Sequence, residues 1–384
     1  MTGAVDLDPI RAKLATLGRV HTSADVAEAM RAEGLLVSDA SLLETVAAIR
    51  RDSVGAGRLD PLLQLDGVTD VLVNGPHAVY VDRGHGLQPA GVAFESDAEV
   101  RKLAQRLAAS VGRRLDEASP FVDARLADGT RVHAILSTLA DPGTCISLRV
   151  PARRSFSLQD MVDSGSLPPA GAQLLTEMIK VKAAFMISGG TGSGKTTLLA
   201  ALLALVPASE RLVIVEDSRE LAPDHPHVIR LEGRPGNAEL TGAVTLTDLV
   251  RQALRMRPDR LIVGEVRGAE ICDLLAAMNT GHEGGCGTVH ANSAGDVPAR
   301  LEALAAIGGM GREALHAQVA AALDVVVHIT RMSSGRRRIA QIHVLERDLR
   351  TGLVHTAPAL TFDERDRAIA GPGARRLEEL LSRS

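Results

Sequence analysis

A glycine-rich run with a single lysine carries the clearest chemistry in this sequence. Residues 189–196 fit the spacing G-x-x-x-x-G-K-[ST], which is typical of a phosphate loop. Glycines permit the tight turn that aims backbone N–H groups at an anion, and a following helix adds its positive dipole end. We expect Lys195 to reach the β- and γ-phosphates of a nucleotide and the Thr196 hydroxyl to ligate Mg²⁺. The expected phosphate-binding residues are Gly189, Gly190, Thr191, Gly192, Ser193, Gly194, Lys195, Thr196 and Thr197.

Two acidic groups follow apolar runs that are typical of buried strands. Glu265 ends the run 261–265, and Glu216 and Asp217 follow the run 212–215. Ligands of open α/β sheets bind at the carboxyl ends of strands, so we expect Glu265 to position or polarise an attacking water. Glu216 is expected to help hold Mg²⁺. The alternative is that these acids only cap a strand or a helix.

Two histidines, His282 and His290, lie on either side of a glycine-rich run at 284–287. The glycines predict a mobile loop, and either histidine could sense the γ-phosphate. A zinc site is the competing interpretation. The eight-residue spacing without a thiolate pair disfavours it.

The composition indicates a globular chain without a general attraction to nucleic acid. Its 384 residues suffice for two ordinary domains, with 45% apolar and 23% charged residues. The formal net charge is −4, and Tyr80 with five phenylalanines are the only aromatic side chains. Because base-stacking groups are scarce, we expect no direct contact with nucleic acid.

The cysteines and the N-terminus bear on the compartment. Three cysteines without a C-x-x-C pair suit a reducing environment and exclude a tetracysteine zinc module. Asp6 and Asp8 occur where a signal peptide would be basic and apolar, and no apolar run is long enough to span a bilayer. We expect a cytoplasmic protein that meets a membrane only through partners.

The chain is predicted to fall into four parts. Residues 1–57 form a helical N-terminal extension, and 58–151 form an α+β domain of short strands around a helix at 97–111. Residues 152–170, rich in Ser, Gly and Pro, form a linker. In 171–384 strands alternate with helices, which indicates an α/β sheet of largely parallel strands that ends in antiparallel strands.

Four motifs occur in an order that resembles the ATPases of the type II and type IV secretion superfamily. They are the phosphate loop, the acidic run 214–221, the strand that ends in Gly264 and Glu265, and the histidine run 280–292. The resemblance covers about residues 58–360 and looks strongest to the branch that powers tight-adherence pili. It implies a RecA-like P-loop NTPase domain preceded by a smaller α+β domain.

The same resemblance implies an ATPase that uses ATP and Mg²⁺. It also implies a homohexamer, peripheral to the inner face of the plasma membrane, that works on an inner-membrane platform protein of a secretion or pilus assembly system. Family members hold nucleotide between two domains, and arginines of the N-terminal domain contact its phosphates. The matching positions are Arg131 and Arg149, with Arg125 a weaker candidate.

Two positions depart from the family pattern. Gly268 stands where many members have an aspartate after the arginine, which puts a salt bridge at that point in doubt. Gly285, Cys286 and Gly287 stand where hydroxyl residues are usual, which predicts a looser loop or slower turnover.

Three alternative functions stay open. A conjugative DNA-transfer motor would need a basic strip, and the compact candidate is the set Arg331, Arg336, Arg337 and Arg338, for which a solvated hairpin is the preferred explanation. A nucleotide-gated scaffold would bind ATP and hydrolyse little of it. A small-molecule kinase is the third, although the second acidic group and the α+β domain disfavour it.

Overall fold

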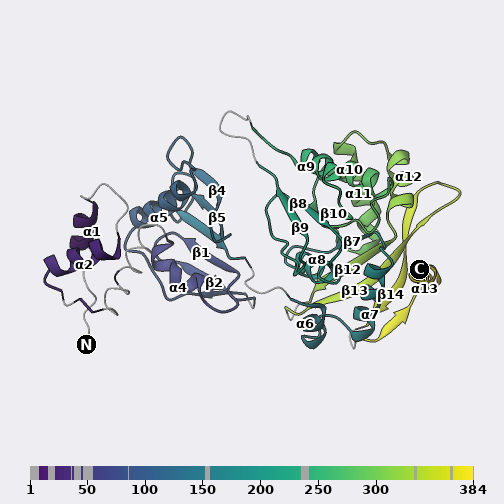
Figure 1. The fold of residues 1–384 in the computed structure, drawn as a ribbon, viewed down its shortest axis with the longest axis horizontal. Coiled ribbons are helices and arrows are strands. Elements are labelled where there is room, and N and C mark those ends of the chain that lie inside the picture. The colour runs from purple at the N-terminus through teal and green to yellow at the C-terminus, as the bar shows by residue number, and fades with distance from the viewer. Residues whose placement is uncertain are drawn as a thin grey trace. The chain divides into compact units, whose positions relative to one another are not determined.

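The computed structural model divides the chain into two compact units, Met1–Arg153 and Arg154–Ser384. It describes residues 8–15, 22–35, 37–38, 45, 55–84, 86–151, 156–234, 242–332, 335–363 and 366–383. Each unit has its own apolar core. The ribbon runs from purple to blue in the first unit and from teal to yellow in the second (Figure 1).

Two short helices begin the first unit. Helices α1 (Asp8–Ala15) and α2 (Ser23–Ala32) pack through a small set of buried apolar residues: Ile10, Leu14, Val26, Ala29 and Met30. The Thr22 side chain and Asp25 form a reciprocal capping box, which fixes where α2 begins. Of the third helix predicted here, over 41–50, only Thr45 lies within the described residues.

The rest of the first unit is a six-stranded antiparallel sheet in the order β3-β2-β1-β6-β5-β4. The strands are β1 (Asp70–Asn74), β2 (Val79–Asp82), β3 (Leu87–Pro89), β4 (Phe121–Arg125), β5 (Arg131–Ile135) and β6 (Cys145–Arg149). A 3-10 turn, η1 (Gly57–Leu59), and a short helix, α4 (Asp60–Leu63), precede it.

Helix α5 (Asp97–Ser110) contacts β5 and β6 of that sheet. Its apolar positions recur every three or four residues, so Val100, Leu103 and Leu107 share one buried stripe. Burial alternates along β5, where Val132 and Ala134 are buried while Arg131 and His133 are exposed. This alternation leaves one face of the sheet polar.

The second unit is built on a nine-stranded mixed sheet in the order β15-β14-β13-β12-β7-β11-β10-β8-β9. The six strands from β12 to β9 in this order run parallel, and β13, β14 and β15 add antiparallel pairs. The strands are β7 (Phe185–Ser188), β8 (Leu212–Glu216), β9 (Val228–Glu232), β10 (Arg260–Val266), β11 (Cys286–Val289), β12 (Val325–Arg331), β13 (Arg337–Arg347), β14 (Val354–Phe362) and β15 (Ala368–Ala370).

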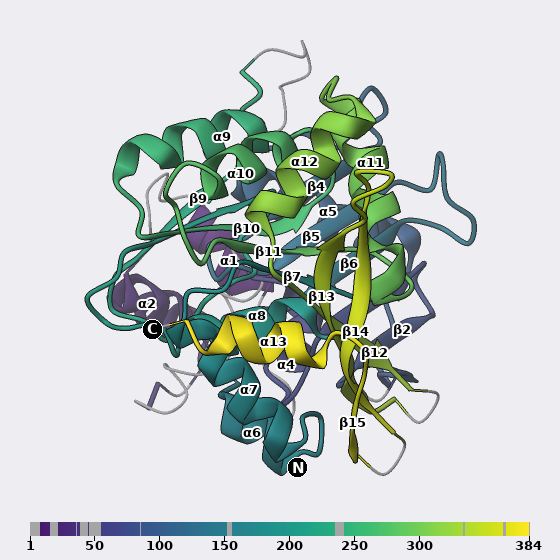
Figure 2. The same cartoon turned by 90° about the vertical axis from the view of Figure 1, so that its right-hand side faces the viewer.

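Helices cover both faces of this sheet, as Figure 2 shows. On one face lie α6 (Leu158–Asp163), α7 (Pro169–Lys180), α8 (Lys195–Leu203) and α13 (Ala374–Leu381). On the other lie α9 (Leu246–Ala253), η2 (Leu254–Met256), α10 (Glu270–Met278), α11 (Val297–Ile307) and α12 (Arg312–Ala322), with η3 (Ala294–Asp296) before α11.

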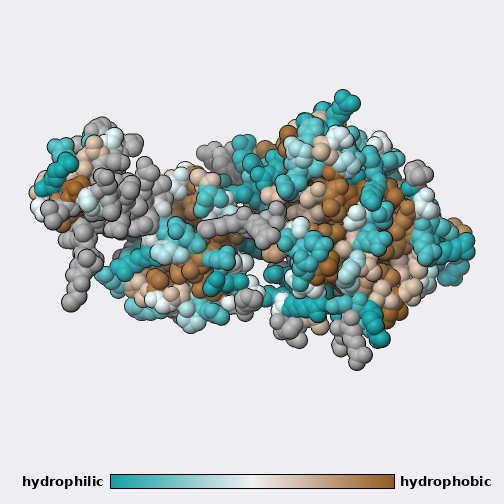
Figure 3. All heavy atoms as spheres, turned by 60° about the horizontal axis from the view of Figure 1, so that its bottom comes forward, coloured by the Kyte–Doolittle hydropathy of each residue, from teal (hydrophilic) through white to brown (hydrophobic). Residues whose placement is uncertain are grey.

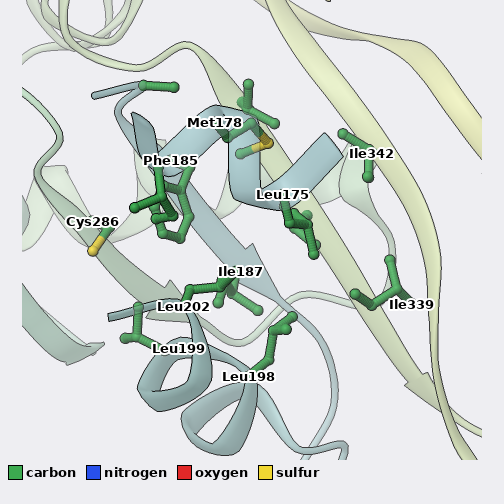
Figure 4. Packing of buried hydrophobic residues seen from close by; sticks show 14 of the residues in the cluster. Leu175, Met178, Phe185, Ile187, Leu198, Leu199, Leu202, Cys286, Ile339 and Ile342 are labelled. Atoms are coloured by element: carbon green, nitrogen blue, oxygen red, sulfur yellow. The ribbon is translucent and has the colours of Figure 1, made fainter. Parts of the chain in front are cut away.

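The central strands are buried on both faces, which explains their continuous apolar sequences. In β7, Phe185 and Ile187 contribute to one apolar layer and Met186 to the other. Figure 4 shows the first layer, where Phe185 and Ile187 pack among side chains of α7, α8, β11 and β13. The loop that follows β7 therefore starts from a rigid position.

The predicted fold class is confirmed, with an α/β unit preceded by a smaller α+β unit. The linker expected over 152–170 is too long, because α6 and the start of α7 lie within it and Leu158 and Met161 are buried. A capping box between Ser157 and Asp160 marks the start of α6 and was the signal available in the sequence. Helices α12 and α13 were not predicted.

The prediction of a mobile glycine-rich loop after Thr280 is wrong for the central part of that run. Residues 286–289 form β11, a fully buried strand between β7 and β10. A Cβ on Gly287 would lie 2.7 Å from the Val263 carbonyl oxygen, and one on Gly285 would lie 2.9 Å from Met278 Cε. The glycines allow close packing between the strand and its neighbours. They do not indicate mobility here.

The surface of the second unit mixes hydrophilic and hydrophobic residues on the face that Figure 3 presents. Among its described residues, the large exposed apolar side chains are Phe156, Leu205, Ile307, Leu349 and Ile369. Within the part of the chain that the structure describes, no helix combines the length and the apolar character that crossing a bilayer requires.

Candidate phosphate-loop site

The phosphate loop connects β7 to α8, as its sequence predicts. Gly194 precedes α8 with φ of +99°, a left-handed conformation that favours glycine. At Gly189 a Cβ would collide with the Ile329 carbonyl oxygen and lie 2.7 Å from Ser193 Oγ. Two of the loop glycines are therefore required by conformation or by close packing.

The Lys195 side chain folds back over this loop. Its Nζ donates hydrogen bonds of 3.0 Å to the carbonyl oxygens of Gly189 and Gly190, and it lies 3.3 Å from His290 Nδ1. Burial lowers the pKa of Lys195, while the carboxylates of Glu265 and Glu220 act in the opposite direction. The ammonium thus lies inside the turn where an anion would bind.

Glu265 and His290 lie at the carboxyl ends of the adjacent parallel strands β10 and β11. Glu265 Oε1 is 2.6 Å from His290 Nε2, although no donor is aligned for a hydrogen bond to this buried oxygen. The other oxygen accepts a hydrogen bond of 2.6 Å from Arg267. A neutral imidazole that carries its proton on Nε2 fits the contact with Lys195, since its Nδ1 lone pair then faces the Lys195 ammonium.

The charges around Glu265 and His290 set their protonation. Burial alone would raise the pKa of Glu265, but the hydrogen bond and charge of Arg267, with His290 and Lys195, bring it below its ordinary value. Burial and the Lys195 charge lower the pKa of His290, against the effect of Glu265. At neutral pH the site therefore holds an ionised carboxylate beside a neutral imidazole.

Arg267 joins the two acidic strand ends. It bonds Glu265 and lies 3.7 Å from Asp217 Oδ2, just beyond the end of β8. The position after it, Gly268, has no carboxylate, and its backbone N–H bonds Glu270 Oε1. Gly268 thus provides no side chain for an ion pair, whereas Arg267 pairs with carboxylates of β10 and of the loop after β8.

Glu216, the last residue of β8, is buried beneath Gly264. Its Oε1 accepts backbone N–H bonds from Glu220 (3.0 Å) and Leu221 (2.9 Å), while its Oε2 is buried without a hydrogen-bond partner. Burial raises the pKa of Glu216 to about 7. The geometry thus gives Glu216 a role in holding the turn 217–221, and its ligation of Mg²⁺ stays a prediction.

The two histidines of the glycine-rich run are separated by β11. His290 follows the strand at the phosphate-loop edge, whereas His282 precedes it, and its Nδ1 lies 3.3 Å from the Ala277 carbonyl oxygen. A four-residue strand is about 13 Å long, so the two lie at opposite edges of the sheet. The geometry therefore favours His290 as the group near a γ-phosphate and leaves His282 away from it.

The remaining loop residues lie where a bound anion could meet them. Gly190, Thr191 and Thr197 are exposed and Thr196 is half-buried at the start of α8. Within the described residues no group of three or more His, Cys, Asp or Glu side chains is arranged to hold a metal ion. A magnesium ion held largely by nucleotide phosphates needs few protein ligands, and the Thr196 hydroxyl suits that arrangement.

The three arginine candidates of the first unit form one row across its sheet. Arg125 of β4 is directly opposite Arg131 of β5, which is directly opposite Arg149 of β6. Asp123 holds Arg131 through two hydrogen bonds of 3.1 and 2.6 Å. Arg131 and Arg149 are exposed.

Sequence reasoning missed one contact with the loop. Arg337 of β13 donates a hydrogen bond from Nε to the Gly192 carbonyl oxygen (3.0 Å). No local pattern links two segments so far apart in the chain. The contact depends on β12 pairing beside β7 and on β13 pairing beside β12.

The fold and site together define a phosphate-loop protein of the RecA-like α/β class. The sequence matches the family described as "Type II/IV secretion system protein" over residues 52–359, and the chain belongs to that family.

Three comparisons show the range of similarity. A putative conjugal transfer protein of Mycobacterium tuberculosis is 52% identical over 316 residues, covering 81% of this chain and 90% of that protein. The type IV secretion system protein PtlH of Bordetella pertussis is 34% identical, covering 74% and 92%. The solved structure of the Legionella pneumophila ATPase DotB has a TM-score of 0.51 at 20% identity, covers 74% of this chain and 78% of that one, and supports the fold alone.

Proposed function

We propose that this protein is an ATP hydrolase that serves as the motor of a bacterial secretion or tight-adherence-type pilus assembly system. The observation that carries the proposal is the ionised Glu265 at the end of β10, linked through His290 to the phosphate-loop Lys195. A carboxylate so placed can orient the water that attacks a γ-phosphate. Family membership and the name of the PtlH relative support the role in secretion.

The proposed roles follow from the charges already described. Lys195, held by two loop carbonyls, neutralises the β- and γ-phosphates once nucleotide enters the loop. His290 lies between Lys195 and Glu265, so loss of the γ-phosphate would alter both of its contacts. Thr196 is proposed to ligate the Mg²⁺ that accompanies ATP, and that ion would supply charge neutralisation on the phosphates.

Arg131 and Arg149 are proposed to contribute guanidinium groups to the phosphates in the assembled motor. The three arginines stand directly opposite one another across β4, β5 and β6, which concentrates positive charge along one line of the sheet. A homohexameric ring at the cytoplasmic face of the inner membrane, acting on a platform protein there, is proposed from the family. The pilus branch and the peripheral location are part of the same proposal.

The test measures ATP hydrolysis and solution mass together, for wild type and for Lys195→Ala, with and without nucleotide. We expect turnover in a particle of about six subunits and its loss in the variant, whose missing ammonium leaves the phosphates without their main cation. Equal turnover in both proteins would remove the site from the chemistry. A wild-type protein that binds ATP without turnover would favour a nucleotide-gated scaffold.

A conjugative DNA-transfer motor is the second candidate, favoured by the name of the 52% identical relative. Its expected basic strip is reduced in the structure. Arg336 bonds the Gly165 carbonyl and Asp366, and the buried Arg338 bonds the carbonyls of Phe362 and Asp363. DNA-stimulated turnover that weakens steeply with salt would support this candidate, and turnover indifferent to DNA would exclude direct DNA handling.

A further inference from the structure

The hairpin formed by β12 and β13 brings two arginines beside the phosphate loop. Arg331 and Arg337 are directly opposite each other in the antiparallel register, so their side chains project from the same face of the sheet. Arg337 donates from Nε to the Gly192 carbonyl oxygen at 3.0 Å. A Cβ on Gly192 would lie 3.9 Å from Arg331 Nη1. Both guanidinium groups therefore lie beside the same loop residue.

The neighbouring arginines are directed elsewhere. Arg338, next to Arg337 on β13, is buried and held by the carbonyls of Phe362 and Asp363. Arg336 is held by Asp366 and by the Gly165 carbonyl. Because side chains alternate along a strand, the opposed pair is distinct from these two structural arginines.

The packing of Arg337 on the loop is close. A Cβ on Gly194 would lie 3.1 Å from Arg337 Cδ, so the aliphatic stem of the arginine covers the last glycine before α8. The hydrogen bond to Gly192 orients the peptide group that precedes Ser193. Arg337 thus restrains the loop on the side that Lys195, bonded to Gly189 and Gly190, does not hold.

Two guanidinium groups at directly opposed positions concentrate positive charge beside Gly192. A polyanion bound in the adjacent loop would be attracted to both of them.

We propose that the Arg331–Arg337 pair binds the polyphosphate of the nucleotide from within the same subunit. Arg337 also acts as a positioning residue for the loop through Gly192. The inference rests on the proposed function, since it needs a nucleotide in the loop. It adds two cations that neither the phosphate-loop motif nor the N-terminal arginine row contains.

The experiment measures the dissociation constants of ATP and ADP at two salt concentrations, with a fluorescent ADP analogue as the displaced probe. Arg331→Gln and Arg337→Gln are each expected to weaken binding about tenfold and to reduce its salt dependence. Arg337→Lys keeps the charge and should recover part of the loss. Arg375→Gln, an exposed arginine of α13 paired with Glu379, is the matched control and should bind as wild type does.

The melting temperature without nucleotide separates binding from folding. Arg331→Gln removes a repelled charge and is expected to leave this temperature unchanged or raise it, so weaker binding by this variant cannot arise from unfolding. Wild-type affinity in both glutamine variants would overturn the inference while the proposed function stands. Failure of the wild-type protein itself to bind nucleotide would instead overturn the proposed function.

Discussion

Glu265 Oε1 and His290 Nε2 lie 2.6 Å apart, because β10 and β11 are parallel neighbours that end at the same edge of the sheet. The contact continues through His290 Nδ1 to Lys195 and through the second Glu265 oxygen to Arg267. Lys195, His290, Glu265 and Arg267 thus form one connected set of ionisable side chains. A change in any of them alters the protonation of the others.

The first prediction concerns Glu265→Gln. The amide keeps the size of the side chain but cannot act as an anionic acceptor for the attacking water, so we expect turnover to fall by about 100-fold or more while ATP still binds. Steady-state hydrolysis and nucleotide titration measure the two quantities. Glu302→Gln is the control, because Glu302 Oε1 contacts His316 Nε2 at 2.8 Å between α11 and α12, away from the loop. Equal losses in both variants would assign the effect to folding.

The second prediction concerns the pH dependence of stability at Glu216. Its pKa in the folded protein is about 7, above its ordinary 4.5, because the carboxyl is buried. The folded state therefore binds a proton more readily than the unfolded state does. The resulting contribution to the free energy of unfolding is complete below pH 4.5 and is lost as the pH rises through about 7. Glu216→Gln mimics the neutral form at every pH.

We expect the free energy of unfolding of Glu216→Gln, relative to wild type, to rise by roughly 2–4 kcal/mol from pH 4.5 to pH 8. Urea denaturation without Mg²⁺ or nucleotide measures it. The exposed Glu177→Gln on α7 provides the comparison for the effect of the substitution itself. If the difference in unfolding free energy between Glu216→Gln and wild type did not change with pH, burial would not raise the pKa of Glu216 in the folded protein.

The motif residues were predictable from the sequence because each strand end is marked locally. An apolar run followed by a glycine-rich turn or by an acid identifies Lys195, Glu216 and Glu265, and parallel pairing brings such ends together. The C-terminal antiparallel strands were recognised by the same kind of pattern.

What sequence reasoning could not provide was placement that depends on tertiary packing. The run at 284–287 has the composition of a loop, yet Gly285 and Gly287 lie where larger residues would collide with Met278 and Val263. His282 and His290 consequently lie at opposite ends of β11. The bond between Arg337 and Gly192 has no local signal at all, because it depends on which strand pairs beside β7.

The third prediction tests that packing directly. In Gly287→Ala the new Cβ would lie 2.7 Å from the backbone oxygen of Val263, which cannot move without disturbing the pairing of β10 and β11. We expect a loss of about 1–3 kcal/mol or more in the free energy of unfolding, measured by denaturant titration. Gly311→Ala, with no atom within 4 Å of its Cβ, should cost less than about 1 kcal/mol. Similar costs at both positions would show that β11 is not tightly packed.

The last prediction concerns the arginine row of the first unit. Arg149 is directly opposite Arg131 on β5, and Asp70 of β1 is its partner on the other side. Removing the charge of Arg149 relieves its repulsion with Arg131 and also removes its attraction to Asp70, and these two effects oppose each other. Arg149→Gln should therefore leave the melting temperature near that of wild type. If the guanidinium meets the γ-phosphate in the assembled motor, turnover should nevertheless fall by a factor of about 10³.

A purely structural arginine would show the reverse pattern, with lower stability and turnover reduced only in proportion to the unfolded fraction. Thermal melts and hydrolysis rates, measured on the same preparations, distinguish the two cases. Arg101→Gln is the matched control, since Arg101 of α5 bonds Glu117 at 2.6 Å. Because that partly exposed pair contributes little, we expect both its melting temperature and its turnover to stay near wild type. Unchanged turnover in Arg149→Gln would remove this arginine from the phosphate-binding set and leave the cations of the second unit to neutralise the nucleotide.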